Sequence, residues 1–171
     1  MKSAPEKFGK GEKLTSSHSL NALDCGNGPQ SFLQSFALTS QKSGKVQTYV
    51  VCGAARHVVG YYSLCVGAVE YVEAPMRVAK GLARHQVPVM ILARLAVDRS
   101  KQKIGLGKGL LKDALLRTMQ AAEIAGIRAF LVHAKDEEAR LFYASFGFEP
   151  SPTDAYHLFL LMKDLRQLVS Y

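Results

Sequence analysis

VPVMILARLAVDRSKQKIGLGKG, residues 87–109, is the stretch that decides the fold. Its apolar first half predicts a strand that ends at Val97, and a polar turn begins at Asp98. A second turn contains Gly105 and Gly107 and leads directly into apolar residues at helical spacing. The stretch therefore predicts a strand, a glycine loop and a helix in succession.

The loop between this strand and this helix is suited to hold an anion. Backbone N–H groups at a helix N-terminus have no intrahelical partners, and the helix dipole adds partial positive charge there. Gly105 and Gly107 have no Cβ, so a phosphate can approach their backbone closely. Lys101, Lys103 and Lys108 add full charges. Tight packing of the helix on the strand is the alternative role for the glycines.

The composition predicts one folded domain, residues 1–171, with a core of its own, because 48% of the residues are hydrophobic. The formal net charge is +8. This charge favours a polyanionic partner such as nucleic acid, CoA or an anionic membrane surface; a basic protein without such a partner is the alternative.

Cysteine usage and hydropathy limit the location of the protein. Cys25, Cys52 and Cys65 lack the spacing of metal ligands, so we expect reduced thiols, no metal and a cytoplasmic location. The N-terminus has no apolar signal region, and no apolar run reaches the roughly 18–20 residues that span a bilayer. We therefore expect no membrane partner.

Upstream of the glycine loop the pattern is mostly that of β-structure. Residues 1–19 are polar; Phe8 and Leu14 are candidates to anchor a first strand, and a loose N-terminal arm is the alternative. Apolar residues at helical spacing predict a helix over 29–38. Residues 46–53 and 58–69 are rich in β-branched and aromatic side chains and predict an antiparallel hairpin, and residues 70–87 are irregular.

Downstream of the loop, helices and strands alternate. We predict a helix over 107–125, a strand over 129–133, a helix over 136–146, a strand over 155–162 and a tail over 163–171. The order predicts a mixed α/β fold. Its sheet should be antiparallel early and parallel where a helix crosses over, with helices on its faces.

Three motifs together resemble the GNAT acyltransferase superfamily. Residues 102–107, QKIGLG, match its Q/R-x-x-G-x-G/A pyrophosphate loop, and residues 95–98, LAVD, lie on the strand before it. Residues 139–148, ARLFYASFGF, resemble its A-x-x-x-Y-x-x-x-G-F helix and turn. The resemblance covers residues 48–162 and implies the GNAT fold and acetyl-CoA as cofactor.

A narrower resemblance is to the acetyltransferase toxins of toxin–antitoxin pairs. Residues 91–98, ILARLAVD, are followed by Gly-Leu-Gly and by LLKDAL at 110–115, and residues 60–64, GYYSL, are similar to the second hairpin strand of these toxins. The resemblance implies a cytoplasmic toxin that acetylates the free amino group of aminoacyl-tRNA and stops translation. It also implies a ribbon-helix-helix antitoxin and a homodimer.

The resemblance assigns the cofactor to two groups of residues. The CoA pyrophosphate would bind the backbone N–H groups of Lys103, Ile104, Gly105, Leu106, Gly107 and Lys108. The pantetheine arm would pair with the backbone of Leu95, Ala96 and Val97, and the Val97 N–H would polarise the thioester carbonyl.

Two residues depart from the pattern of the family. Lys103 occupies a position where these toxins commonly have glycine, which would make the loop stiffer there. Asp136 occupies a position where many members carry an asparagine that helps to bind the cofactor arm, and that role is not carried over.

Tyr143 is the candidate catalytic residue. It matches the family tyrosine whose phenol protonates the departing CoA thiolate, and a phenol with a pKa of ~10 can donate to a thiolate. An aromatic residue packed on the core is the alternative.

A general base is not evident from the sequence. Glu70, Glu73, His85 and His133 are candidates. A free α-amino group has a pKa of ~8 and an ester-linked one a lower pKa still, so much of the ester-linked amine is unprotonated at neutral pH, whereas a lysine side chain at ~10.4 would need a base. The pattern therefore favours an α-amine as the acceptor.

Basic residues supply candidates for contact with tRNA. Arg77, Lys80 and Arg84 precede the organising strand, and phosphate contacts of this kind give salt-dependent affinity. A solvated surface loop is the alternative. Arg94 lies within the apolar strand and needs a partner, which is either the substrate or an internal carboxylate.

The hypothesis that joins these observations is an acetyl-CoA-dependent toxin that acetylates aminoacyl-tRNA. The first alternative is a general N-acetyltransferase acting on a protein N-terminus or a small amine, although the +8 charge would repel polyamines and cationic drugs. The second is a CoA-binding or partner-binding module without activity, against which Tyr143 and the two loop glycines argue.

Overall fold

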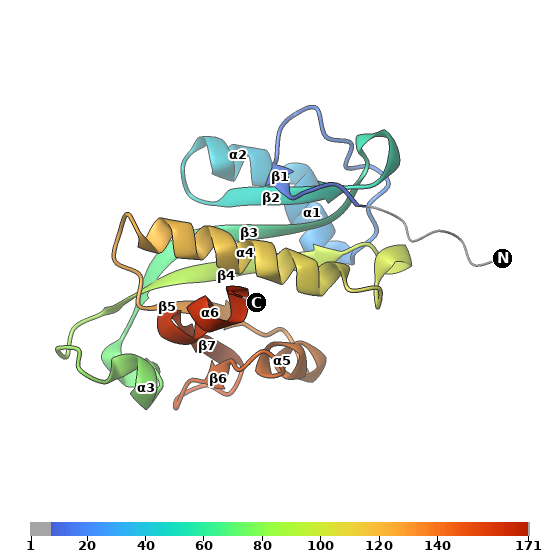
Figure 1. The fold of residues 1–171 in the computed structure, drawn as a ribbon. Helices are drawn as coiled ribbons and strands as arrows, with labels where there is room; N and C mark the ends of the chain where they lie inside the picture. The colour runs from blue at the N-terminus through green and yellow to red at the C-terminus, as the bar shows by residue number, and fades with distance from the viewer. Residues whose placement is uncertain (1–7, 171) are drawn as a thin grey trace. The chain divides into compact units, whose positions relative to one another are not determined.

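A computed structural model describes residues 8–170 of the chain (Figure 1). Seven strands hydrogen-bond in the order β1-β2-β3-β4-β5-β7-β6. The chain divides into two compact units. Of the described residues, the first unit contains 8–64 and 94–113, and the second contains 65–93 and 114–170.

The strands of the first unit are antiparallel. β1 (Glu12–Lys13) pairs with β2 (Gln47–Cys52), and β2 pairs with β3 (Val58–Val69). A register shift between Val51 and Cys52 interrupts the second pairing. The predicted hairpin is therefore confirmed.

Two short helices of the first unit replace the single helix predicted over 29–38. α1 (Asn27–Ser35) stops before Phe36, whose φ of −124° is not helical, and α2 (Ala37–Lys42) begins directly after Phe36. Both helices contribute to one apolar cluster. Its buried members are Leu14, Leu23, Leu33, Ala37, Val50, Val58, Tyr61 and Ala96.

The described part of the N-terminal arm is packed rather than loose. Leu14 is only 1% exposed, and its N–H donates to the Thr48 carbonyl over 2.9 Å. His18 is also buried. The alternative of a loose arm is therefore wrong for residues 8–19, because burial of these side chains outweighs their polar neighbours. Residues 1–7 lie outside the described residues.

The second unit contains the parallel part of the sheet. The first part of β4 (Val87–Val97) belongs to this unit. It pairs in parallel with β5 (Ala129–His133), with Val89 opposite Ala129. β5 pairs with β7 (His157–Leu161), which in turn pairs with the short β6 (Glu149–Pro150), both antiparallel. The predicted change from antiparallel to parallel pairing is confirmed.

A short helix replaces the predicted C-terminal tail. α6 (Met162–Val169) follows β7 directly and buries Met162 and Leu165. Met162 and Leu165 are three positions apart in the sequence, so their side chains lie on one face of the helix. Two apolar positions on an eight-residue helix give a weak periodic signal, and the prediction of a tail was wrong for that reason.

Two of the remaining helices, α4 (Leu106–Ala122) and α5 (Glu137–Ala144), lie close to their predicted places. α3 (Met76–Ala79) was not predicted and is a single turn within the stretch predicted to be irregular. α4 follows the glycine loop and is shared by both units, and α5 belongs to the second unit. Within the described residues, no helix has the length and apolar character needed to cross a membrane.

The three cysteines form no disulfide among the described residues and are half-buried. Burial raises the pKa of the Cys52 thiol and of the Cys65 thiol. Both therefore stay protonated at neutral pH and behave as small hydrophobic side chains.

Candidate functional site

The glycine loop of the first unit ends in an open helix N-terminus. The Gly105 carbonyl accepts from the Gly109 N–H over 3.0 Å, so Gly105 is the N-cap of α4. Gly105 has a φ of 87°, which favours glycine. The N–H groups of Leu106, Gly107 and Lys108 begin the helix and have no intrahelical acceptors. The predicted anion-binding geometry is present.

Lys103 has a left-handed backbone, with a φ of 63°. A side chain in this conformation costs roughly 1–2 kcal/mol relative to the ordinary helical region. Glycine would adopt it without that cost. The departure noted at this position in the sequence is therefore a point of backbone strain in the loop.

Asp98 anchors the turn before the loop. One carboxylate oxygen accepts from the Ser100 N–H at 2.9 Å and from its hydroxyl at 2.6 Å, and the other accepts from the Asp24 N–H at 2.9 Å. Burial would raise the pKa of Asp98, but these hydrogen bonds outweigh it and hold the pKa below its usual range. The Asp-x-Ser spacing was the available signal for this role.

Gly60 on β3 allows close approach to β4 and α4. A Cβ at this position would lie 2.9 Å from Leu110 Cδ1 and 3.3 Å from the Ala96 carbonyl oxygen. Next to it, the Val59 carbonyl accepts from the Asp98 N–H over 2.8 Å. Gly60 thus fixes how β3 meets the end of β4. In the sequence, this glycine is distinguished only as part of the GYYSL stretch at residues 60–64.

The end of β4 extends beyond the strand with which it pairs. The parallel register runs to Leu92 opposite Val132, and β5 ends one residue later at His133, whereas β4 continues to Val97. Gln102 from the loop donates to the Val97 carbonyl over 3.3 Å. The backbone of the last β4 residues is therefore placed next to the glycine loop within the first unit. The three predicted residues here are Leu95, Ala96 and Val97.

Tyr143 lies on α5 in the second unit and is 6% exposed. Its ring is 5.1 Å from that of Phe142 and 5.5 Å from that of Phe148, between centroids. Burial raises the pKa of Tyr143 above its ordinary value. The phenol is therefore protonated throughout the neutral range and can act only as an acid there.

Asp136 caps the helix that carries Tyr143. Its carboxylate accepts from the Ala139 N–H over 2.8 Å, which satisfies one of the free donors at the start of α5. Asparagine and aspartate cap helices about equally well. The aspartate at this position therefore has a structural role as the cap of α5.

Arg77 is held by two carboxylates of the second unit. Its guanidinium lies 2.8 Å from Asp164 and 2.5 Å from Glu149. Asp164 and then Glu149 raise the pKa of Arg77. This predicted tRNA contact has its charge compensated within the protein.

The other predicted tRNA contacts are exposed. Lys80 and Arg84 belong to the second unit, and Arg94 to the first. The Arg94 guanidinium lies 4.3 Å from the centroid of the Phe32 ring. The internal partner expected for Arg94 is therefore an aromatic face and not a carboxylate.

The candidate bases have different surroundings. Glu70 and Glu73 form a reciprocal capping box around one short turn, so both are engaged. His133 stacks on His157, with ring centroids 3.9 Å apart. Burial and then the neighbouring His157 lower the pKa of His133, which leaves it neutral and able to accept a proton.

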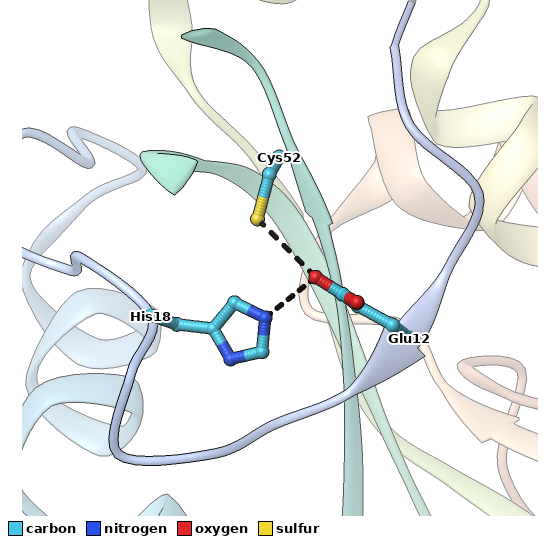
Figure 2. Close-up of side chains that lie close together, drawn as sticks. All are labelled: Glu12, His18 and Cys52. Atoms are coloured by element: carbon cyan, nitrogen blue, oxygen red, sulfur yellow. Dashed lines mark hydrogen bonds and ion pairs between the residues drawn. The ribbon is translucent and has the colours of Figure 1, made fainter. Parts of the chain in front are cut away.

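A separate polar cluster lies in the first unit, where Glu12, His18 and Cys52 place their ligand atoms within 4.8 Å of one another (Figure 2). His18 Nδ1 accepts from the Thr15 N–H over 3.0 Å. Its Nε2 lies 2.7 Å from the Glu12 carboxylate and 3.2 Å from Arg56 Nη2. Contacts within the protein therefore already engage both ring nitrogens.

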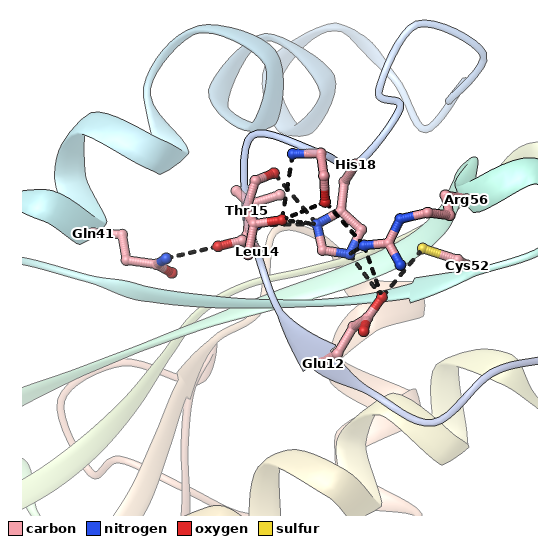
Figure 3. A network of polar contacts seen from close by, with 8 residues as sticks. Glu12, Leu14, Thr15, His18, Gln41, Cys52 and Arg56 are labelled. Atoms are coloured by element: carbon pink, nitrogen blue, oxygen red, sulfur yellow. Dashed lines mark hydrogen bonds and ion pairs between the residues drawn. The ribbon is translucent and has the colours of Figure 1, made fainter.

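Hydrogen bonds give this cluster a structural role (Figure 3). The bond from His18, opposed by partial burial, lowers the pKa of Glu12. Arg56 lies 3.7 Å from the same carboxylate, and Gln41 donates to the Leu14 carbonyl over 2.8 Å. The network ties the N-terminal segment to β2 and α2.

The family model described as the acetyltransferase (GNAT) domain matches residues 45–150. The chain belongs to the GNAT acetyltransferase family. This GNAT protein is 45% identical over 168 residues to a tRNA-acetylating toxin of Mycobacterium tuberculosis (strain ATCC 25618 / H37Rv), a match that covers 98% of the chain and 96% of the relative.

Solved structures agree with this relationship. AtaT complexed with acetyl-methionyl-tRNAfMet is 30% identical, with a TM-score of 0.87 over 95% of this chain and 99% of the other. A Tyr-to-Phe mutant of AtaT, bound to the C-terminus of the antitoxin AtaR and acetyl-CoA, is 29% identical, with a TM-score of 0.81 over 97% and 100%. The acetyl-CoA-dependent GNAT fold predicted from the motifs is thus confirmed.

Proposed function

We propose that this GNAT protein acetylates the free α-amino group of aminoacyl-tRNA and thereby blocks translation. The observation that carries the proposal is the 45% identity, along nearly the whole of both chains, to a tRNA-acetylating toxin. The open N-terminus of α4 and the buried phenol of Tyr143 supply the two groups that this chemistry requires.

The cofactor-binding residues of the proposal lie in the first unit. Acetyl-CoA supplies the activated acetyl group as a thioester. Backbone N–H groups at the start of α4 bind its pyrophosphate, and the end of β4 pairs with the pantetheine amides. The Val97 N–H then donates to the thioester carbonyl as negative charge develops on its oxygen. The residues involved are Leu95, Ala96, Val97, Lys103, Ile104, Gly105, Leu106, Gly107 and Lys108.

Tyr143 completes the reaction as a general acid. The acceptor amine attacks the thioester carbonyl carbon, the C–S bond breaks, and the phenol gives its proton to the departing thiolate; the proton lost by the attacking nitrogen restores the phenol, directly or through water. Its raised pKa keeps the phenol protonated at neutral pH. A free α-amino group has a pKa of ~8 and an ester-linked one a lower pKa, so a substantial fraction is unprotonated at neutral pH. No dedicated base is needed for such an acceptor.

The proposal assigns the remaining basic residues to the tRNA. Lys80, Arg84 and Arg94 are exposed and contact phosphates, whereas Arg77 acts through the ion pairs that hold it. These contacts give affinity without reading sequence. Which amino acid is accepted depends on other side chains.

Partners follow from the same proposal. A related AtaT structure contains the C-terminus of an antitoxin. We assign to this chain a ribbon-helix-helix antitoxin, a homodimeric state and a cytoplasmic location, where aminoacyl-tRNA is found. Co-expression of such an antitoxin should relieve growth arrest, and light scattering should give twice the chain mass.

The decisive experiment measures transfer of labelled acetate. Purified protein is incubated with labelled acetyl-CoA and aminoacyl-tRNA, and label should appear on the α-amine. Cell-free translation should stop only when acetyl-CoA is present. Unlabelled aminoacyl-tRNA together with a labelled N-terminal peptide would replace the proposal with a general N-acetyltransferase.

A further inference from the structure

A cavity of about 480 Å³ in the second unit is lined largely by cations. It lies where the residues after α3, the start of β5 and the start of α6 meet. We call this site the basic cavity. Its lining residues are Arg77, Lys80, Ile127, Arg128, Leu161, Met162, Lys163 and Arg166.

The cations of the basic cavity are unequally compensated. Arg77 is held by Asp164 and Glu149, and Arg166 lies 3.7 Å from Glu123. Within residues 8–170, Lys80, Arg128 and Lys163 have no carboxylate partner. Three positive charges therefore face one cavity without a counter-charge from the protein.

Arg128 is fixed in place by main-chain carbonyls. Its Nε donates to the Val78 carbonyl over 2.8 Å, and its Nη2 donates to the Lys80 carbonyl over 3.0 Å. These bonds orient the planar guanidinium before any ligand arrives. Because the guanidinium has five N–H donors, others remain for an anion. A preorganised guanidinium loses little entropy on binding.

The start of α6 carries both signs of charge. Its first N–H, that of Met162, donates to the Arg128 carbonyl over 3.2 Å, and Asp164 in the first turn pairs with Arg77. Lys163 is the cation of this turn that has no carboxylate partner among the described residues. Ile127, Leu161 and Met162 form an apolar part of the wall, and low local polarity strengthens each electrostatic interaction.

We infer that the basic cavity binds a backbone phosphate of the tRNA substrate, an inference that rests on the proposed function. Phosphodiester oxygens accept from guanidinium and ammonium donors in this geometry. The net charge of +8 favours a polyanion at long range. The cavity adds Arg128 and Lys163 to the predicted tRNA contacts.

An acidic protein segment is the competing ligand, and the cavity favours RNA over it. Carboxylates of this chain already engage Arg77, which has two, and Arg166, which has one. The three uncompensated cations line the same cavity, which suits the phosphates of an RNA backbone more than an isolated carboxylate. Binding of an acidic segment is therefore treated as an outcome of the test.

The test removes two charges whose side chains make no internal contacts among the described residues. The variant K80Q/K163Q is compared with K10Q/K112Q, which loses the same charge at exposed lysines away from the cavity. Affinity for uncharged tRNA should fall by about 3- to 10-fold in the first variant only. The slope of log affinity against log salt should become shallower by about 1–2.

Further measurements separate this inference from the proposed function. The KM for aminoacyl-tRNA should also rise in the single variant K163Q, while CoA affinity and acetylation of an aminoacylated CCA fragment stay unchanged. Equal tRNA affinity in the two double variants overturns the inference even if the wild type acetylates tRNA. Loss of binding to an acidic antitoxin peptide with tRNA affinity intact overturns it too. If wild-type protein acetylates no tRNA, the binding comparison still decides the cavity.

Discussion

The two units present their functional groups in different ways. The first unit offers mainly backbone: the N–H groups at the start of α4 and the extended end of β4 beside Gly60. The second unit offers side chains: the buried phenol of Tyr143 and the cations of the basic cavity. Backbone groups bind any phosphate in the same way, whereas side chains determine chemistry and partner. Under the proposed function, the first unit binds the cofactor through its backbone and the second supplies the general acid Tyr143.

The largest expected effect tests this division directly. Replacing Tyr143 with Phe should lower kcat by about 100- to 10,000-fold, since a general acid is lost, while CoA affinity stays unchanged. Tyr156→Phe is the control, because that phenol is 41% exposed and lies 3.4 Å from Glu137. Single-turnover acetylation and CoA titration measure both. An active Tyr143→Phe enzyme would move catalysis out of the second unit.

Gly60 and Gly67 both lie on β3, the former in the first unit and the latter in the second. Substituting each one measures how much the stability of its unit depends on the glycine. Gly60→Ala should destabilise the protein by about 1–3 kcal/mol, because the new Cβ meets the Ala96 carbonyl oxygen, a backbone atom that cannot give way easily. Gly67→Ala should cost less, since its closest neighbour is the flexible end of Ile91. Denaturant unfolding measures both. Equal losses would contradict the view that the first unit depends on backbone approach.

Lys103 allows strain and charge to be separated within the loop. Lys103→Gly should remove the strain of the positive φ and leave the unfolding free energy equal or about 1 kcal/mol higher. Lys103→Ala keeps the strained backbone and should not gain stability. Both variants lose one charge and should bind CoA a few-fold more weakly. Stronger CoA binding by Lys103→Ala would place Lys103 away from the phosphates.

The smallest expected effect is a pH dependence in the second unit. The pKa of His133 is lowered in the folded protein, so the unfolded chain takes up the proton first as pH falls below about 6.5. Stability should therefore decrease as pH falls from about 6.5 towards the folded pKa. His133→Gln should reduce this loss, as measured by melting temperature between about pH 7.5 and pH 5.5. An unchanged pH dependence would assign it to other groups.

The same contrast explains what the sequence could predict. The Gly105 and Gly107 spacing and the A-x-x-x-Y-x-x-x-G-F motif are local in the sequence. They therefore predict the loop, the helix after it and the candidate residue Tyr143 from the sequence alone. Asp98 had a local signal in its Asp-x-Ser spacing. Most strand positions were also predicted, because alternation and β-branched residues mark them.

The basic cavity could not be predicted in the same way. Its cations come from residues 77–80, 128 and 163–166, which only the fold brings together. Lys163 and Arg166 lie in a segment predicted to be a tail. The ion pairs of Arg77 depend on Asp164 in that same segment. Side-chain sites built from distant segments leave no spacing to detect.

Arg128 gives the basic cavity a thermodynamic consequence. The same guanidinium that lines the cavity also holds the Val78 and Lys80 carbonyls at the end of α3. An anion that orders Arg128 must therefore also suppress local opening of α3, since both processes draw on one side chain. RNA binding should slow amide hydrogen exchange at Ala79 and Lys80. Occupancy of the basic cavity is then measurable as slower amide hydrogen exchange at the end of α3, a helix that is only one turn long.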